Sequence, residues 1–261
     1  MNILDRIVAD KRIEVAQKEK LFPTSYWEQS PLFERKTQSL KAKLRADGVG
    51  IIAEHKRRSP SKAIIKQTED VRQVAIDYTQ AGASGLSILT DGKYFGGSLD
   101  DLVQARAATK LPLLRKEFII GPYQLIEAKA HGADAILLIA AVLEQKDIKS
   151  LSELAQSLGL EVLLEVHNQE ELNKALIPSL DLIGVNNRNL KTFEVSLETS
   201  RALAQQIPPN FVKISESGIS NPQAVQDLHR HGYSGFLIGE HFMKGDNIKE
   251  ETEKFIATCR A

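Results

Sequence analysis

The chain has 261 residues, of which 42% are hydrophobic, and it carries 34 Lys and Arg residues against 34 Asp and Glu residues. This composition supports a sizeable core, and the zero net charge argues against nucleic acid or an anionic membrane surface as a partner. The single cysteine, Cys259, excludes an internal disulfide, and no stretch is apolar enough for a signal peptide or a membrane span, so we expect a cytoplasmic protein.

The first 45 residues are predicted to form a helical extension. Asn2 can cap a first helix that should end near Pro23, and a second helix is expected over residues 32–44. Runs with the character of strands begin only after this segment. We therefore expect residues 1–45 to pack as an extension on a barrel formed by residues 46–261, within a single domain overall.

Short apolar runs then alternate with amphipathic helices along the rest of the chain. The runs cover residues 51–56, 85–90, 111–117, 135–141, 160–166, 182–187, 212–217 and 235–239. The helices between them have recognisable starts at Thr68, Ser98, Asn168 and Asn221, the last followed by proline at the first helical position.

A weak internal echo supports a repeated unit. Ala81-Gly-Ala-Ser-Gly-Leu, His131-Gly-Ala-Asp-Ala-Ile and His231-Gly-Tyr-Ser-Gly-Phe each close a helix and open a strand. Eight strand-helix units in a chain of this size favour an α/β fold, the closed (β/α)8 TIM barrel, over an open doubly wound sheet.

Polar side chains follow several of the apolar runs. Lys116 comes directly after one strand, Glu165 stands within another, Asn186 ends a third, and Glu54 and Lys56 share one face of the first. An isolated Glu-x-Lys pair is more often a salt bridge, and a single lysine is more often a solvated loop residue. Four such strand ends at one level indicate a pocket in which lysine and glutamate supply a proton donor and a proton acceptor.

The last two predicted strands end in glycine, at Ser217-Gly218 and at Gly239-Glu240. In barrels, the loops after the seventh and eighth strands commonly bind phosphate through backbone N–H groups, and glycine allows close approach. No His, Cys or carboxylate cluster has metal-ligand spacing, and no nucleotide-binding glycine motif is present. We therefore expect neither a metal nor a cofactor.

Motifs on several strands, taken together, resemble those of indole-3-glycerol phosphate synthases. They are Glu54-His-Lys-Arg-Arg-Ser-Pro-Ser, Lys93-Tyr-Phe-Gly-Gly-Ser, Arg115-Lys-Glu-Phe-Ile, Asn186-Asn-Arg-Asn-Leu, Ser215-Glu-Ser-Gly-Ile and Leu237-Ile-Gly-Glu. The resemblance spans nearly the whole chain. It implies ring closure, decarboxylation and dehydration of 1-(2-carboxyphenylamino)-1-deoxyribulose 5-phosphate to indole-3-glycerol phosphate.

The resemblance also assigns roles to single residues. It makes Lys116 the general acid and Glu165 the general base of the dehydration, places Lys56 opposite the substrate carboxylate, and gives Glu54 and Asn186 positioning roles. The remaining implied positions bind the phosphosugar substrate: Ser59, Phe95, Phe118, Leu137, Arg188, Leu190 and Glu216 for its body, and Ser217, Gly218, Gly239 and Glu240 for its phosphate. The resemblance further implies a monomer.

Two residues depart from the family pattern as we expect it. Glu117 stands where aspartate is more common, and Glu240 stands where serine is common. Neither is the implied acid or base, so the departures bear on loop geometry. We also expect the N-terminal helices to help close the site near Ser59, because the loop over residues 57–67 is long and basic enough to move.

Three alternative functions remain open at this stage. A Schiff-base aldolase would use Lys116 as a nucleophile, which requires a depressed pKa that Glu54 and Glu165 would oppose. The neighbouring isomerase of the same pathway shares fold and phosphate binding but lacks the Glu-x-Lys and Lys-x-Phe combination. A phosphosugar-binding barrel without turnover would need only the glycine loops.

Overall fold

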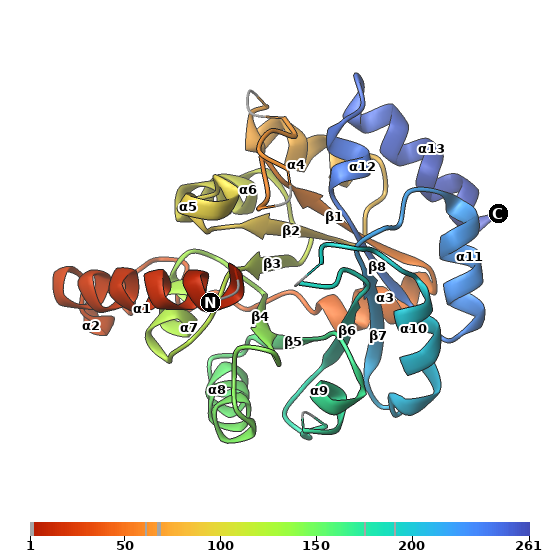
Figure 1. Cartoon of the computed structure of the whole chain (residues 1–261). Helices are drawn as coiled ribbons and strands as arrows, with labels where there is room; N and C mark the ends of the chain where they lie inside the picture. The colour runs from red at the N-terminus through yellow and green to blue at the C-terminus, as the bar shows by residue number, and fades with distance from the viewer. Residues whose placement is uncertain (1–2, 61, 67–68, 175, 191) are drawn as a thin grey trace.

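Eight parallel strands form a closed barrel in chain order, with β8 pairing back onto β1 (Figure 1). The structure is a computed structural model that describes residues 3–60, 62–66, 69–174, 176–190 and 192–261. The strands are β1 Gly50–His55, β2 Gly85–Leu89, β3 Leu113–Lys116, β4 Ala135–Ile139, β5 Glu161–Val166, β6 Leu182–Asn186, β7 Val212–Glu216 and β8 Gly235–Ile238. The predicted TIM barrel is confirmed, and each strand lies within a predicted run or starts one residue before it.

Helices surround the barrel, and the first two helices of the chain extend to one side of it (Figure 1). Three lie before β1: α1 Ile3–Leu21, α2 Thr24–Trp27 and α3 Leu40–Asp47. The others are α4 Val71–Gln80, α5 Gly92–Phe95, α6 Leu99–Ala108, α7 Tyr123–Ala130, α8 Gln145–Ser157, α9 Gln169–Asn173, α10 Glu198–Leu203, the short 3₁₀ helix η1 Ala204–Gln206, α11 Pro222–Arg230, α12 Glu240–Met243 and α13 Ile248–Arg260.

The predicted helix starts are confirmed where the structure describes them. The side chains of Ser98, Asn168 and Asn221 each accept a hydrogen bond from the backbone N–H three residues on. Asn2 and Thr68 lie outside the described residues. The cap of α4 is Asp70, which accepts from the N–H of Arg72.

The internal echo corresponds to one repeated turn. Gly82, Gly132 and Gly232 follow helices α4, α7 and α11, and all three have φ between 85° and 90°. This left-handed conformation ends a helix and is cheap only for glycine. The three sequence segments therefore share a helix-to-strand connection, as predicted.

The second predicted helix, over residues 32–44, is wrong in its first half. Ser39 caps α3 by accepting from the N–H of Ala42, so the helix begins only at Leu40. The residues before it form turns and extended chain that bind the barrel through polar contacts. Arg35 contacts Asp134 at 2.7 Å, and Gln38 N–H donates to the same carboxylate. These long-range contacts outweigh local helix propensity.

Helix α3 closes the end of the barrel at which the strands begin. Its Leu40 and Leu44 are fully buried and belong to the interior cluster with Ile52, Leu163 and Leu182. The first residues of β1, β2 and β8 are glycines, which leave room for these two leucines. A Cβ on Gly85 would lie 2.7 Å from Leu40, and one on Gly235 would lie 3.2 Å from Leu44. A ligand site must therefore lie at the opposite end of the barrel, where the strands end.

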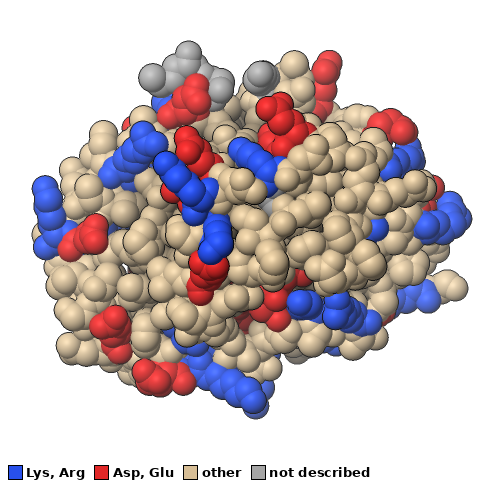
Figure 2. Space-filling view, turned by 90° about the horizontal axis from the view of Figure 1, so that it is seen from below, with Lys and Arg blue, Asp and Glu red and all other residues tan. Residues whose placement is uncertain are grey.

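The surface carries both signs of charge without separation on the face drawn in Figure 2, where Lys and Arg are interspersed with Asp and Glu. This distribution agrees with the zero net charge of the sequence. Within the described part of the chain, no helix combines the length and the apolar character that crossing a bilayer requires.

Candidate active site

A cavity of about 450 Å³ opens at the carboxyl ends of the strands. Every strand contributes to its lining, as the barrel geometry dictates. The strand residues that line it include Glu54, Leu89, Lys116, Leu137, Glu165, Asn186, Glu216 and Leu237. The polar ends predicted from separate strands therefore meet in one place.

Lys116 is the central cation of this cavity. Its ammonium group donates to Glu216 and lies 3.6 Å from Glu165. Burial alone would lower the pKa of Lys116, but Glu216, Glu165 and Glu54 together raise it above its usual value. Lys116 is therefore a protonated amine at neutral pH, held between carboxylates from β5 and β7.

Glu216 is the most deeply buried of these carboxylates, with its side chain only 2% exposed. Burial and the neighbouring Glu165 and Glu54 raise its pKa to about 7, although Lys116 opposes the shift. Gly184 on β6 makes room for this side chain, because a Cβ there would collide with Glu216 Oε1. The sequence predicted only a substrate contact here, whereas the structure shows a direct partner of Lys116.

Glu54 and Lys56 pair as their shared strand face predicts. Lys56 Nζ lies 3.4 Å from Glu54 Oε1, and Ser87 Oγ donates to Glu54 Oε2 at 3.0 Å. Burial would raise the pKa of Glu54, but Lys56 and Lys116 lower it on balance. Glu54 is thus an ionised carboxylate near two lysines. It forms an ion pair with Lys56, and it acts on Lys116 by electrostatic attraction without direct contact.

One side of the cavity is apolar and aromatic. Phe95 and Phe118 lie with ring centroids 5.9 Å apart, and Lys56 Nζ stands 5.8 Å from the Phe95 centroid. Leu137 from β4 completes the predicted wall. A cationic group beside an aromatic surface suits a flat, anionic substrate ring.

The loops after β7 and β8 form the opposite side. Ser217 and Gly218 both have left-handed φ values, of 67° and 76°. A serine in this conformation is costly and marks a constrained loop. Gly239 lies against Glu54, since a Cβ there would be 2.9 Å from that side chain. Glu240 follows at the start of α12.

Glu240 differs from the other residues of the predicted phosphate site because its side chain is anionic. Its carboxylate lies 3.0 Å from Lys62 Nζ and 2.6 Å from Lys244 Nζ. Hydrogen bonds from Lys244 and Lys62 lower the pKa of Glu240 to about 2. Two lysines are thereby held beside the glycine loops.

Comparisons with known proteins identify the family of this chain. A family model described as indole-3-glycerol phosphate synthase matches residues 4–255. The chain belongs to the indole-3-glycerol phosphate synthase family. A relative of that name from Bacteroides thetaiotaomicron is 48% identical and one from Aliarcobacter butzleri is 41% identical, covering 98% and 97% of this chain and 98% of each relative.

Solved structures confirm the fold. Thiamine phosphate pyrophosphorylase from Pyrococcus furiosus aligns with a TM-score of 0.62 at 16% identity, over 85% of this chain and 98% of that chain. Membership of the indole-3-glycerol phosphate synthase family confirms the resemblance found in the motifs. It also confirms the predicted class of activity, a decarboxylating lyase of tryptophan biosynthesis.

The indole-3-glycerol phosphate synthase motifs converge as predicted, because every residue named from them lines the cavity. Beside those already described, the lining includes Ser59, Arg188 and Leu190. Arg188 N–H donates to Asn186 Oδ1 at 3.0 Å, which fixes the amide at the end of β6.

Two residues next to this indole-3-glycerol phosphate synthase site were not predicted to belong to it. His167 Nε2 lies 3.4 Å from Glu165, and its Nδ1 lies 3.1 Å from Glu171. Burial would lower the pKa of His167, but Glu171 and Glu165 raise it on balance. Asn187 donates to Ser215 Oγ and to the backbone of the β7 loop. Both residues directly follow the end of a strand, and this position is the only feature of the sequence that could have predicted them.

Helix α1 is a further part of this site. Ile3, Leu4 and Ile7 line the cavity from outside the barrel. Ser59, near which we expected the N-terminal helices to help close the site, lines the same cavity. Among the described residues, no group of three or more His, Cys, Asp or Glu side chains is arranged to hold a metal ion.

Proposed function

We propose that this chain converts 1-(2-carboxyphenylamino)-1-deoxyribulose 5-phosphate into indole-3-glycerol phosphate, carbon dioxide and water, with Lys116 as the general acid. The observation that carries the proposal is the ammonium group of Lys116, bonded to Glu216 and 3.6 Å from Glu165 inside the apolar-walled cavity. Family membership supplies the reaction, and this cluster supplies the proton donor.

Ring closure needs a donor at the developing alkoxide. The ring carbon that carries the carboxylate attacks the ribulose carbonyl, and Lys116 protonates the carbonyl oxygen to a hydroxyl group. Carbon dioxide then leaves and the ring regains its aromatic electrons. Lys56, beside Phe95, faces the carboxylate before it departs, and Glu54 holds Lys56 in place.

Dehydration completes the reaction. The hydroxyl group takes a proton from Lys56, or from Lys116 once it has been reprotonated, and leaves as water, while Glu165 takes the proton that the ring system loses. Asn186 and Glu216 position the intermediate and Lys116. Phe95, Phe118 and Leu137 enclose the aromatic ring, where exclusion of water favours loss of carbon dioxide.

The sugar and phosphate occupy the remaining side of the cavity. Ser59, Arg188 and Leu190 contact the sugar chain, and Ser217, Gly218 and Gly239 bind phosphate through their backbones. Glu240 binds phosphate through its backbone N–H at the start of α12, while its carboxylate keeps Lys62 and Lys244 beside the phosphate.

The state of Lys116 disfavours the Schiff-base aldolase. A nucleophilic amine must be neutral, whereas the carboxylates around Lys116 raise its pKa. We also propose a monomer, as the family resemblance implies, and the composition favours a cytoplasmic location.

The test is indole fluorescence after mixing the protein with the carboxyphenylamino-deoxyribulose phosphate. Lys116→Ala should lower kcat by roughly 10³-fold and Glu165→Gln by roughly 10²-fold, because each removes a proton-transfer group. Lys149→Ala, on the exposed face of α8, is the matched control and should leave kcat unchanged.

Two outcomes would contradict the proposal. An inactive parent protein that the substrate still protects from heat would indicate phosphosugar binding without turnover. Covalent trapping of substrate on Lys116 by borohydride would indicate aldolase chemistry.

A further inference from the structure

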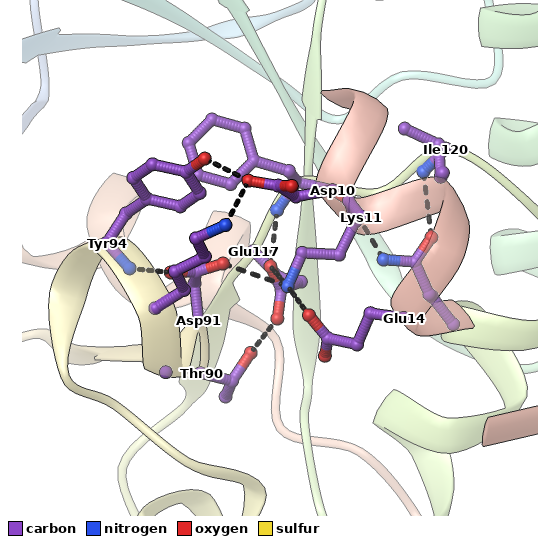
Figure 3. Close-up of polar contacts among 12 residues, drawn as sticks. Asp10, Lys11, Glu14, Thr90, Asp91, Tyr94, Glu117 and Ile120 are labelled. Carbon is purple, nitrogen blue, oxygen red and sulfur yellow. Dashed lines mark hydrogen bonds and ion pairs between the residues drawn. The ribbon is translucent and has the colours of Figure 1, made fainter. Parts of the chain in front are cut away.

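Lys11 is a fully buried lysine on helix α1, outside the proposed catalytic cluster. Its side chain is 2% exposed, and its ammonium group meets three carboxylates: Glu14 at 2.8 Å, Asp91 at 2.9 Å and Glu117 at 3.1 Å (Figure 3). An ammonium group has three N–H donors, so each donor has its own carboxylate. The segment that the sequence indicated as an extension is thus joined to the barrel by a buried ionic cluster.

Asp91 connects Lys11 to the aromatic wall. It follows β2 and caps α5 by accepting from the N–H of Tyr94 (Figure 3). The last residue of α5 is Phe95, which lines the cavity. The position of Asp91 therefore sets where Phe95 stands.

Glu117 connects Lys11 to the strand that carries Lys116. Its Oε1 accepts from the N–H of Phe118 at 2.8 Å, and its Oε2 accepts from Thr90 Oγ at 2.8 Å. Glu117 is also one of the two residues that depart from the expected family pattern, and its side chain, longer than that of aspartate, reaches across to α1. A single ammonium group thus ties together the segments that bear Phe95, Lys116 and Phe118.

Lys11 also fixes the part of α1 that reaches the cavity. Ile7 lies one helical turn before it on the same face, and Ile3 and Leu4 lie one turn further toward the mouth. The barrel walls and the α1 wall of the cavity therefore share one anchoring point.

The charge balance around Lys11 makes it hard to replace. Burial alone would lower the pKa of Lys11, but Glu117 and Asp91 raise it, so the lysine is charged. Among the described residues, the further charged groups around this cluster are Arg115, 3.7 Å from Glu117, Lys18, 3.0 Å from Glu14, and Glu127, which pairs with both of these cations. Without Lys11, buried carboxylates would be left short of cations, and one would take up a proton or swing away.

We propose that Lys11 is a positioning residue for ring closure, which places Lys116 against the substrate carbonyl by fixing the Glu117 and Asp91 loops. Helix α1 is then part of the catalytic apparatus rather than a cover. This inference rests on the proposed function, because it takes Lys116 as the acid and Phe95 and Phe118 as the walls of the ring site.

The experiment measures steady-state kinetics of the full chain at 25 °C, after circular dichroism confirms folding. Lys11→Met should lower kcat roughly tenfold or more, because the loop that begins at Glu117, directly after Lys116 at the end of β3, shifts. The loss should shrink as the pH falls from 8 to 6, because protonation of one carboxylate relieves the repulsion. Adding Glu117→Gln to Lys11→Met should recover part of kcat for the same reason.

Lys93→Met is the matched control. Lys93 pairs with Asp10 at 2.7 Å and so joins the same helix to the same loop, but at an exposed position. It should leave kcat and KM within twofold of the parent.

Lys11→Met with parental kcat, KM and pH profile would overturn the inference and leave Lys11 as a structural brace. If Lys11→Met does not fold, the single variant Glu117→Gln tests the inference. A lower kcat is expected for Glu117→Gln, and parental kinetics would overturn the inference. A parent protein without indole-forming activity would overturn the proposed function, and this inference with it.

Discussion

Glu216 is a carboxyl group buried where the barrel offers little solvation, so its ionised form is disfavoured. Its carboxylate has one cation within contact, Lys116, and two further carboxylates nearby, Glu165 and Glu54. In the described part of the chain, Glu216 Oε1 has no hydrogen-bond partner. Such a group orients Lys116 for catalysis but lowers the free energy of unfolding when it is ionised.

This arrangement predicts a dependence of stability on pH. The pKa of Glu216 is about 7 in the folded chain and 4.5 for an unperturbed glutamate, so the folded state holds the proton to higher pH. The stability from this group is present below pH 4.5 and is lost as the pH rises through 7. Glu216→Gln should therefore stabilise the protein more at pH 8 than at pH 5, by on the order of 2 kcal/mol.

Urea unfolding at the two pH values measures this difference. Glu144→Gln, which removes a carboxylate that is 77% exposed, provides the control. Equal effects of Glu216→Gln at pH 5 and pH 8 would show that Glu216 is not proton-linked to folding.

The residues of the site were predictable where they stand at strand ends. Lys116, Glu165 and Asn186 each interrupt an apolar run, and parallel strands bring such positions to one rim. Their pairing was not predictable. The resemblance gave positioning roles to Glu54 and Asn186, and the structure adds Glu216 as a direct partner of Lys116, because β3 and β7 face each other across the barrel.

At the scale of elements, helix α3 determines how the barrel is closed at its base. Leu40 and Leu44 fill the space that Gly50, Gly85 and Gly235 leave open. This explains why Ser-Gly occurs at the starts of β2 and β8 in the internal echo, whereas β4, on the other side of the barrel, begins with Ala135.

Leu44→Ala should destabilise the protein by about 2–5 kcal/mol, because it removes a fully buried side chain and leaves a cavity beside Gly50 and Gly235. Leu21→Ala, at a position 72% exposed on α1, should change stability by less than about 0.5 kcal/mol. Urea unfolding at constant pH compares the two variants. Similar losses for both would contradict the assignment of α3 as the barrel plug.

The strands of the fold were predictable and the N-terminal segment only partly so. Alternating runs and capping residues marked the barrel because each repeat is a local pattern. The chain from Arg35 to Ser39 is extended because it bonds to Asp134, Gly159 and Glu161, which are about a hundred residues away in sequence. No local pattern carries that information.

At the scale of the whole molecule, the N-terminal segment serves both ends of the barrel. Residues of α1 line the mouth, and α3 fills the base. Two truncations should separate these roles. A chain starting at Ser39 keeps α3 and its cap, so it should unfold cooperatively but bind substrate more weakly. A chain starting at Ala46 lacks Leu40 and Leu44 and should lose cooperative unfolding.

Calorimetric titration with substrate and urea unfolding report on the two roles. Unchanged substrate affinity in the chain starting at Ser39 would show that α1 is a cover alone. Cooperative unfolding of the chain starting at Ala46 would show that the barrel closes without its plug.

The last helix ends beside that plug. Arg260 on α13 donates to the backbone carbonyl of Val49 at 3.1 Å and lies 3.4 Å from Asp47, at the end of α3. The C-terminal side of the chain is thus anchored at the closed base, while Ile3 lies at the open mouth. A second domain or an affinity tag joined after Ala261 would project away from the substrate entrance, whereas one joined ahead of Ile3 would stand beside it. The barrel has a preferred side for attachment, and that side is its base.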